Sequence, residues 1–201
     1  MSASPFVYLA SQSPRRQALL DQIGVNYKVL LPADAEAAEA LEAVLPQESA
    51  LKYVKRVTRL KVLAALEQIQ LQSLESAPVL CADTTVVVDR HILGKPANES
   101  EATQMLSLLS GKTHQVLTAV AIGHNQDIQI ALSRSRVKFA SMSAADIQDY
   151  VASQEPMGKA GAYAIQGRAS AFISHVSGSY SGIMGLPLYE TSQLLKQVRA
   201  V

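Results

Sequence analysis

Apolar residues are distributed along the chain in two patterns, short continuous runs and residues repeated at helical spacing. The runs are typical of buried strands, and repeats every three or four positions are typical of helices. The runs predict strands over residues 6–10, 26–31, 79–88, 115–122 and 128–140. The repeats predict helices over residues 14–24, 47 to about 74, 100–109, 143–151 and after Pro187.

Capping residues support the ends of two of these helices. Ser13 is an N-cap candidate, Pro14 suits the first helical position and Gly24 suits the C-terminal cap. Ser143 and Asp146 have the spacing of a capping box. Residues 33–46 predict an exposed connection, and residues 158–185 form a Gly-rich tract. The interleaved strands and helices predict an α/β fold with a mixed, twisted sheet flanked by helices.

The length and the charge balance narrow the classes of protein. With 201 residues, 48% of them hydrophobic, we expect one compact domain over residues 1–201. Its division into two lobes around a central cleft is left open. The formal net charge of +1 creates no global field that would attract a nucleic acid or an anionic membrane. Any anion must therefore be bound by a local site, and we expect neither nucleic acid nor membrane as a partner.

Cysteine use and the N-terminal residues bear on the compartment. Cys81 is the single cysteine of the sequence, so no intrachain disulfide can form. The N-terminal residues lack a basic region followed by an apolar stretch, and no run approaches about 18 apolar residues. We expect a cytoplasmic protein, and the sequence leaves a homodimer open.

The first candidate site is the segment from Ser11 to Arg16, where a strand runs into a helix. The N-terminal amides of a helix favour an anion, and guanidinium groups match the geometry of phosphate oxygens. Two arginines, Arg15 and Arg16, occupy this positive end of the helix. The segment predicts a phosphate site, with solvent-facing arginines and a simple Ser13 cap as the alternative.

The second candidate is Asp83, a carboxylate inside a predicted core strand. A buried charge is costly unless it is paired, hydrogen-bonded or bound to a cation. Near phosphate-binding cations, such an acid suits metal-assisted phosphoryl chemistry. The alternative is an aspartate at a strand end that accepts hydrogen bonds from loop amides. Asp83 is the best single catalytic candidate.

Further charged residues complete the candidate set. The cations Arg56, Lys61, Lys95 and Lys159 suit a polyphosphate, and Lys61 stands out because it falls on or beside the apolar stripe of its helix. Glu36 is the candidate acid for a metal beside Asp83. Its alternative is surface charge, which Asp34, Glu39 and Glu42 share with it.

In these motifs the chain resembles the Maf family. The similarity covers nearly the whole chain, in order, through Leu9-Ala10-Ser11-Gln12-Ser13-Pro14-Arg15-Arg16, Ala82-Asp83-Thr84, Gly94-Lys95-Pro96, Leu109-Ser110-Gly111-Lys112 with His114, Glu155-Pro156 with Lys159-Ala160-Gly161-Ala162-Tyr163, Ile165-Gln166-Gly167, Gly178-Ser179-Tyr180 and Gly185-Leu186-Pro187-Leu188.

The resemblance implies a Maf/ITPase-like fold and an activity. The implied reaction is hydrolysis of a nucleoside triphosphate between the α and β phosphates, with a divalent cation, Mg²⁺ or Mn²⁺. The resemblance implies that Asp83 is the proton acceptor and that Asp83 and Glu36 hold the metal. It implies phosphate binding by Ser11, Ser13, Arg15, Arg16, Lys61 and Lys95.

The resemblance also implies a substrate branch. Arg15, Thr84 and Gln166 are similar to the residues of the branch that acts on dTTP and UTP, whereas the branch that acts on 7-methyl-GTP has tryptophan, glutamine and glutamate there. Two alternatives stay open, a broad house-cleaning pyrophosphatase for non-canonical nucleotides and a non-catalytic nucleotide-binding regulator of septum formation.

Overall fold

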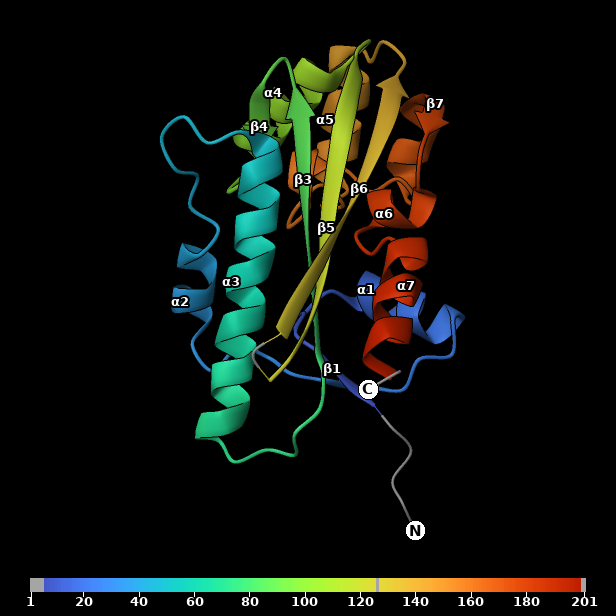
Figure 1. Ribbon diagram of the computed structural model, residues 1–201. Helices are drawn as coiled ribbons and strands as arrows, with labels where there is room; N and C mark the ends of the chain where they lie inside the picture. The colour runs from blue at the N-terminus through green and yellow to red at the C-terminus, as the bar shows by residue number, and fades with distance from the viewer. Residues whose placement is uncertain (1–5, 126, 200–201) are drawn as a thin grey trace. The chain divides into compact units, whose positions relative to one another are not determined.

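A mixed seven-stranded sheet organises the computed structural model, which describes residues 6–125 and 127–199 (Figure 1). The strand order is β2-β1-β3-β5-β6-β7, and β4 pairs with β3. β1 is parallel to β2 and β3, whereas β4 and β7 are antiparallel to β3 and β6. The strands are β1 (Val7–Leu9), β2 (Tyr27–Val29), β3 (Val79–Val88), β4 (His91–Leu93), β5 (Thr113–His124), β6 (Asp127–Phe139) and β7 (Ile173–Ser177).

Helices connect and flank these strands. The α-helices are α1 (Pro14–Gln22), α2 (Ala35–Ala40), α3 (Ala50–Leu71), α4 (Glu99–Leu109), α5 (Ala144–Ala152), α6 (Tyr180–Met184) and α7 (Leu188–Arg199), and two short 3₁₀ helices are η1 (Ala160–Ala162) and η2 (Arg168–Phe172). The predicted α/β fold with a mixed sheet and flanking helices is confirmed. In the described part of the chain, none of the helices has both the length and the apolar character that crossing a membrane requires.

The helix ends confirm some capping predictions and correct others. The Ser143 and Asp146 capping box is present, and Gly24 follows α1 with a φ of 65°. Ser13 occupies the N-cap position of α1, but its side chain makes no capping hydrogen bond. The predicted connection over 33–46 contains the short helix α2, whose N-cap Asp34 accepts a hydrogen bond from the Ala37 amide.

The chain divides into two compact units, and three strands run from one to the other. Unit 1 contains residues 1–83, 118–132 and 185–201, and unit 2 contains residues 84–117 and 133–184. The unit boundaries fall within β3, β5 and β6, so each of these strands contributes residues to both units. Because strands cannot be divided without breaking the sheet, we propose that both units belong to the single predicted domain.

The core of unit 1 forms where α3 packs on the sheet (Figure 1). Val62, Ala65 and Ile69 of α3 lie at helical spacing and pack with Val79 and Cys81 of β3 and with Ala121 of β5. Residues 79 and 81 share one face of β3, because successive side chains of a strand alternate between its faces. The same face carries Asp83.

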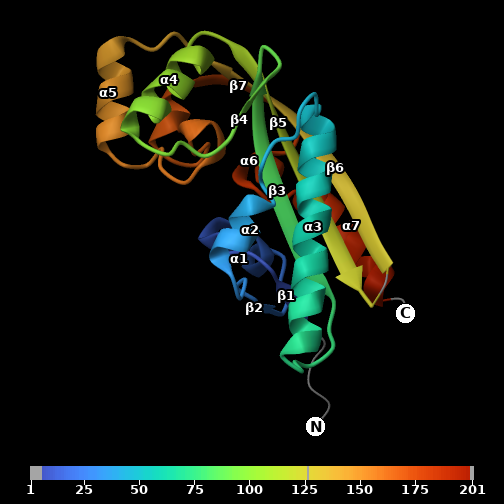
Figure 2. The same ribbon diagram turned by 90° about the vertical axis from the view of Figure 1, so that its left-hand side faces the viewer.

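The core of unit 2 includes apolar faces of α4 and α5, which lie side by side (Figure 2). Leu106 and Leu109 of α4 and Ile147 of α5 belong to one buried cluster with Val116 and Phe139 of the sheet. Ile165 from the Gly-rich tract joins this cluster. The Gly-rich tract therefore contributes buried side chains to the core of unit 2 and is not only a series of exposed turns.

Candidate active site

The strand β3 carries Asp83 into a largely apolar surrounding. Its relative exposure is only 7%, and the residues before it, Leu80, Cys81 and Ala82, are fully or almost fully buried. The predicted core-strand carboxylate is therefore confirmed as buried. A carboxylate in this position needs a partner, and α3 supplies one.

Lys61 is that partner. On α3 it lies four residues before the buried Ala65 and three after the buried Thr58, so its stem follows the face that packs on the sheet. Its Nζ donates to Asp83 Oδ1 at 2.7 Å and to Glu42 Oε1 at 2.7 Å. Burial by itself lowers the pKa of Lys61, but the charges of Asp83 and Glu42 and their hydrogen bonds raise it above its ordinary value. Lys61 is thus a stable cation between two carboxylates.

Glu42 enters this cluster because α3 holds the chain around it. The Tyr53 hydroxyl donates to the Glu42 carbonyl at 2.9 Å, and Arg56 donates to the Ala43 carbonyl at 2.8 Å. Arg56 also forms an ion pair with Glu48 at 2.7 Å. These contacts fix the segment after α2, and they assign Arg56 to a structural role.

Sequence reasoning missed Glu42 as a site residue. It was one of several acids in an Ala/Glu/Asp-rich stretch whose composition indicated surface charge. Nothing in the local spacing separates it from Glu39. The signal that could have marked it is the pair Tyr53 and Arg56, two large polar side chains on the following helix that can bond to loop carbonyls.

The N-terminal end of α1 forms the second part of the candidate site. Ser11 is buried, and its Oγ accepts hydrogen bonds from the Ser13 amide at 3.2 Å and from Arg16 Nη1 at 3.0 Å. Arg16 Nε donates to the Gly185 carbonyl at 2.8 Å, which fixes the guanidinium. Burial lowers the pKa of Arg16, and the Asp83 carboxylate opposes that shift. The electrostatic influence of Asp83 on Arg16 links this segment to the Lys61 cluster.

Two other predicted residues of unit 1 lie near these elements in sequence. Arg15 follows Pro14 in the first turn of α1 and is partly buried, which lowers the pKa of its guanidinium. Glu36 lies in the first turn of α2 and is exposed. The structure thus brings Glu42, and not Glu36, to Lys61.

Unit 2 contains the remaining predicted residues. Thr84 follows Asp83 in β3 and is partly buried, and Lys95 is exposed in the segment between β4 and α4. Gln166 is exposed in the turn closed by the hydrogen bond from the Gly167 amide to the Ala164 carbonyl, at 3.0 Å. Lys159 donates through Nζ to the Glu155 carbonyl.

Carboxylates near Lys61 are the candidate metal ligands of this site. Within residues 6–125 and 127–199, His, Cys, Asp and Glu side chains form no cluster of three or more that could hold a metal ion. A pair of carboxylates, Asp83 and Glu42, does converge on Lys61. Two carboxylates are enough for a Mg²⁺ site, because proteins usually bind Mg²⁺ through one or two carboxylates, and water and substrate phosphates supply the other ligands.

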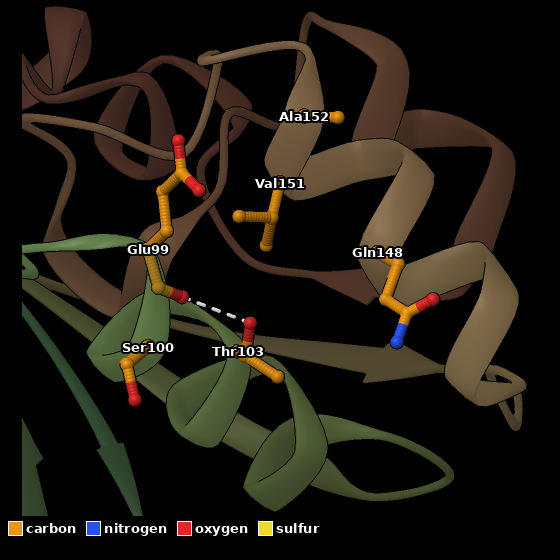
Figure 3. A pocket seen from close by; sticks show the side chains of 6 residues that line it. All are labelled: Glu99, Ser100, Thr103, Gln148, Val151 and Ala152. Atoms are coloured by element: carbon orange, nitrogen blue, oxygen red, sulfur yellow. Dashed lines mark hydrogen bonds between the residues drawn. The ribbon is translucent and has the colours of Figure 1, made fainter.

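A hollow between α4 and α5 contains none of the predicted site residues. Figure 3 shows its lining, in which the Thr103 hydroxyl donates to the Glu99 carbonyl. The lining residues are Glu99, Ser100, Thr103, Gln148, Val151 and Ala152. The hollow has no concentration of cations for a polyphosphate, so the candidate site is the cluster around Asp83.

Comparison with known proteins places the chain in a family. Residues 6–198 match the family described as Maf-like protein. A dTTP/UTP pyrophosphatase of a Polaromonas species is 64% identical over 98% of this chain and 97% of its own length. Proteins of the same name from Albidiferax ferrireducens and Cupriavidus pinatubonensis are 60% and 55% identical, each over 96% of this chain and over 96% and 97% of their own lengths. The chain belongs to the Maf-like protein family.

Proposed function

We infer that this chain is a nucleoside triphosphate pyrophosphatase that hydrolyses dTTP and UTP to the monophosphate and pyrophosphate. The observation that carries this function is the buried Asp83 carboxylate, which Lys61 contacts at 2.7 Å beside the Ser11 and Arg16 segment. The relatives named dTTP/UTP pyrophosphatase support the substrate, because they are 55–64% identical over nearly the whole chain.

The cations would bind the triphosphate. Arg15, Arg16, Lys61 and Lys95 would neutralise its charge, and Ser11 and Ser13 would contribute hydroxyl and amide groups at the start of α1. The positive end of the α1 dipole favours an anion at the same place. The fixed position of Arg16 between Ser11 and Gly185 means that little side-chain entropy is lost on binding.

Asp83 would act on the water that attacks the α-phosphorus. Lys61 holds Asp83 in place through the contact between its Nζ and Asp83 Oδ1 at 2.7 Å, and a carboxylate oxygen can accept a proton from water. As the water oxygen bonds to the α-phosphorus, its proton passes to Asp83 and the bond between that phosphorus and the bridging oxygen breaks. Pyrophosphate leaves with the bridging oxygen. The surrounding apolar residues exclude competing water from Asp83 and strengthen its interactions with the cations.

The carboxylates of this cluster fit a divalent cation. Asp83 and Glu42 supply the oxygen ligands that Mg²⁺ and Mn²⁺ prefer, and their shared contact with Lys61 shows that two carboxylates converge on one cation. We therefore propose Asp83 with Glu42 as the metal ligands, and Glu36, the ligand predicted from the sequence, as the alternative second acid. When bound, the metal would polarise the phosphate oxygens and offset charge that develops on the leaving pyrophosphate.

Three residues would select the base. We assign this role to Arg15, Thr84 and Gln166. The amide of Gln166 has both a donor and an acceptor, so it can pair with the edge of a neutral pyrimidine, whereas a glutamate would favour a cationic methylated guanine. The exposed position of Gln166 at the tip of a turn leaves its amide accessible to a ligand.

The test is a nucleotide panel with product identification. We would measure kcat/KM for dTTP, UTP, 5-methyl-UTP, CTP, ITP and 7-methyl-GTP, with Mg²⁺ or Mn²⁺ and with EDTA. The proposal predicts pyrophosphate and monophosphate as products and the highest kcat/KM values for dTTP and UTP. Similar values across the panel would instead favour a broad house-cleaning enzyme. Nucleotide binding without pyrophosphate release would favour the non-catalytic regulator.

A further inference from the structure

The turn that carries Gln166 is held at both ends by one hydrogen-bonded pair, Tyr150 and Glu155. Tyr150 lies on α5 with a relative exposure of 2%, and its hydroxyl accepts a hydrogen bond from the Ala164 amide at 3.3 Å. The same hydroxyl donates to Glu155 Oε1 at 2.7 Å. The other carboxylate oxygen, Glu155 Oε2, accepts from the Arg168 amide at 3.0 Å. The pair therefore contacts the backbone just before and just after the turn.

The carboxylate also packs directly against the turn. A Cβ atom added to Gly167 would overlap the Glu155 carboxylate, so only glycine allows this approach. Burial by itself would raise the pKa of Glu155, but the Arg168 and Ala169 amides and the Tyr150 hydroxyl lower it below its ordinary value. Glu155 is therefore an ionised acceptor at neutral pH, and hydrogen bonds to ionised groups are the stronger kind.

Gln166 itself is exposed between these anchors. Ile165 before it is buried in the core of unit 2, and the Gly167 amide closes the turn on the Ala164 carbonyl. A flexible turn would let the glutamine amide sample many orientations and would weaken discrimination between bases. A turn fixed at both ends restricts the amide to a limited set of orientations, which reduces the entropy lost when a base binds.

We propose that Tyr150 and Glu155 are positioning residues for base selection, which act through the Ala164–Gly167 turn on Gln166. This inference rests on the proposed function, because it assigns Gln166 to the nucleobase. It extends base selection to residues of α5 and the segment after it, which touch neither substrate nor metal. Their effect should appear in KM and in discrimination between nucleotides more than in kcat.

The test compares Tyr150→Phe and Glu155→Gln with Tyr163→Phe. The control variant also removes a buried tyrosine hydroxyl of the same core, but one that bonds to His114 Nε2 at 2.8 Å and not to the turn. For Tyr150→Phe and Glu155→Gln we expect the ratio of kcat/KM for dTTP to that for CTP to fall about fivefold or more, mainly through KM. For Tyr163→Phe we expect a ratio within about twofold of the original.

A double-variant cycle separates positioning from a merely structural role. If Tyr150 acts through Gln166, the Gln166→Ala variant has already lost the discrimination to which Tyr150 contributes. Discrimination between dTTP and CTP should then be the same in Gln166→Ala/Tyr150→Phe as in Gln166→Ala. Additive losses would overturn the inference, and so would unchanged discrimination in both Tyr150→Phe and Glu155→Gln. Gly167→Ala gives an independent variant, because it displaces the carboxylate without changing Tyr150 or Glu155, and it should show the same loss.

Two further outcomes are distinguishable. If the unaltered chain releases no pyrophosphate from any nucleotide, the proposed function fails and the role in base selection fails with it. If the unaltered chain prefers dTTP and UTP but the three variants keep that preference, only the positioning role is overturned. Hydrogen exchange of the Ala164 and Arg168 amides checks the variants, which should lose protection there while Tyr163→Phe keeps it.

Discussion

A single ammonium group organises the charges of the candidate site. Lys61 contacts Asp83 and Glu42 at 2.7 Å each, and most of its side chain is shielded from solvent. Removing one member of such a partly buried set leaves an uncompensated charge, which costs more than the interaction itself contributes. Each charge of the cluster therefore depends on the others for compensation. Such a set of charges is suited to bind an anionic substrate and the proposed metal.

The proposed second metal ligand can be tested with a pair of matched variants, Glu42→Gln and Glu36→Gln. Glu42 lies beside Lys61 and Asp83, whereas Glu36 is exposed on α2. We expect Glu42→Gln to raise the Mg²⁺ concentration for half-maximal dTTP hydrolysis about tenfold or more, and Glu36→Gln to change it less than about twofold. The opposite order would assign the second ligand to Glu36.

The two key charges of the cluster were predictable because each is out of place in its local pattern. Asp83 interrupts a continuous apolar strand, and Lys61 interrupts the apolar stripe of a helix. Glu42 follows no such pattern. Its position depends on Tyr53 and Arg56, which bond to loop carbonyls more than ten residues away in sequence, and local spacing carries no information about that contact.

His114 predicts a pH dependence of stability. It is 1% exposed, and burial lowers its pKa from 6.5 to about 4. In the unfolded chain His114 binds a proton below about pH 6.5, whereas in the folded chain it stays neutral down to about pH 4. The free energy of unfolding therefore decreases as the pH drops through this window. The loss from pH 8 to pH 5 is about 2 kcal/mol for this group.

Urea unfolding at pH 8 and pH 5 would measure this loss. The phenylalanine of His114→Phe cannot titrate. Between pH 8 and pH 5, the free energy of unfolding of this variant should therefore decrease by about 2 kcal/mol less than that of the unaltered chain. An equal decrease in both proteins would show that other groups cause the acid sensitivity.

At the scale of elements, the close approach of α3 to β5 depends on a glycine. A Cβ added to Gly123 would overlap Val62 Cγ1 and lie 3.1 Å from Leu66 Cδ1, both on α3. Crowding of this kind in a packed core costs about 1–3 kcal/mol. Gly123→Ala should therefore lower the free energy of unfolding by that amount. Because α3 also carries Lys61, this packing helps to set the position of the site.

Gly94→Ala provides the matched control for Gly123→Ala. A Cβ at Gly94 meets no atom within 4 Å, so we expect a change of less than about 0.5 kcal/mol in chemical unfolding. Equal destabilisation by the two variants would contradict the steric explanation.

The elements that were predicted well are those with long periodic patterns. β3 has the predicted range 79–88, and α3 differs from its prediction by a few residues because Ser49 caps it and Ala50 begins it. Short elements were missed for a physical reason. α2 is only six residues long and buries none of them, so no apolar period marks it, and its Asp34 cap is one acid among several.

The Gly-rich tract shows the same limit of sequence reasoning. Glycines there suggested turns, but the tract also contains η1, η2, β7 and α6, which are short and depend on tertiary contacts. Gly178 illustrates this, because its φ is 110° and a Cβ there would lie 2.9 Å from the Arg134 carbonyl on β6. Which turn meets which strand depends on pairing between distant segments, and such pairing leaves no local pattern.

At the scale of the whole molecule, substrate and metal should stabilise the fold together. A ligand that binds only the folded chain adds about 2.7 kcal/mol at a hundred times its Kd, which raises the Tm of a protein of this size by about 5–10 °C. We expect this shift with Mg²⁺ and a dTTP analogue that has a non-hydrolysable α-β bridge. EDTA should remove most of it, and a shift that EDTA leaves unchanged would contradict a metal-dependent site.

The central claim, that Asp83 activates the attacking water, is tested most directly by pyrophosphate release from dTTP by Asp83→Asn. Asparagine has nearly the same shape as aspartate but cannot act as the base that accepts the proton. In the variant, Lys61, which contacts Asp83 Oδ1 at 2.7 Å, would contact a neutral amide oxygen instead. With circular dichroism and Tm showing a folded variant, we predict a kcat lower by about 10³-fold or more. A kcat within about threefold of that of the unaltered chain would contradict the assignment.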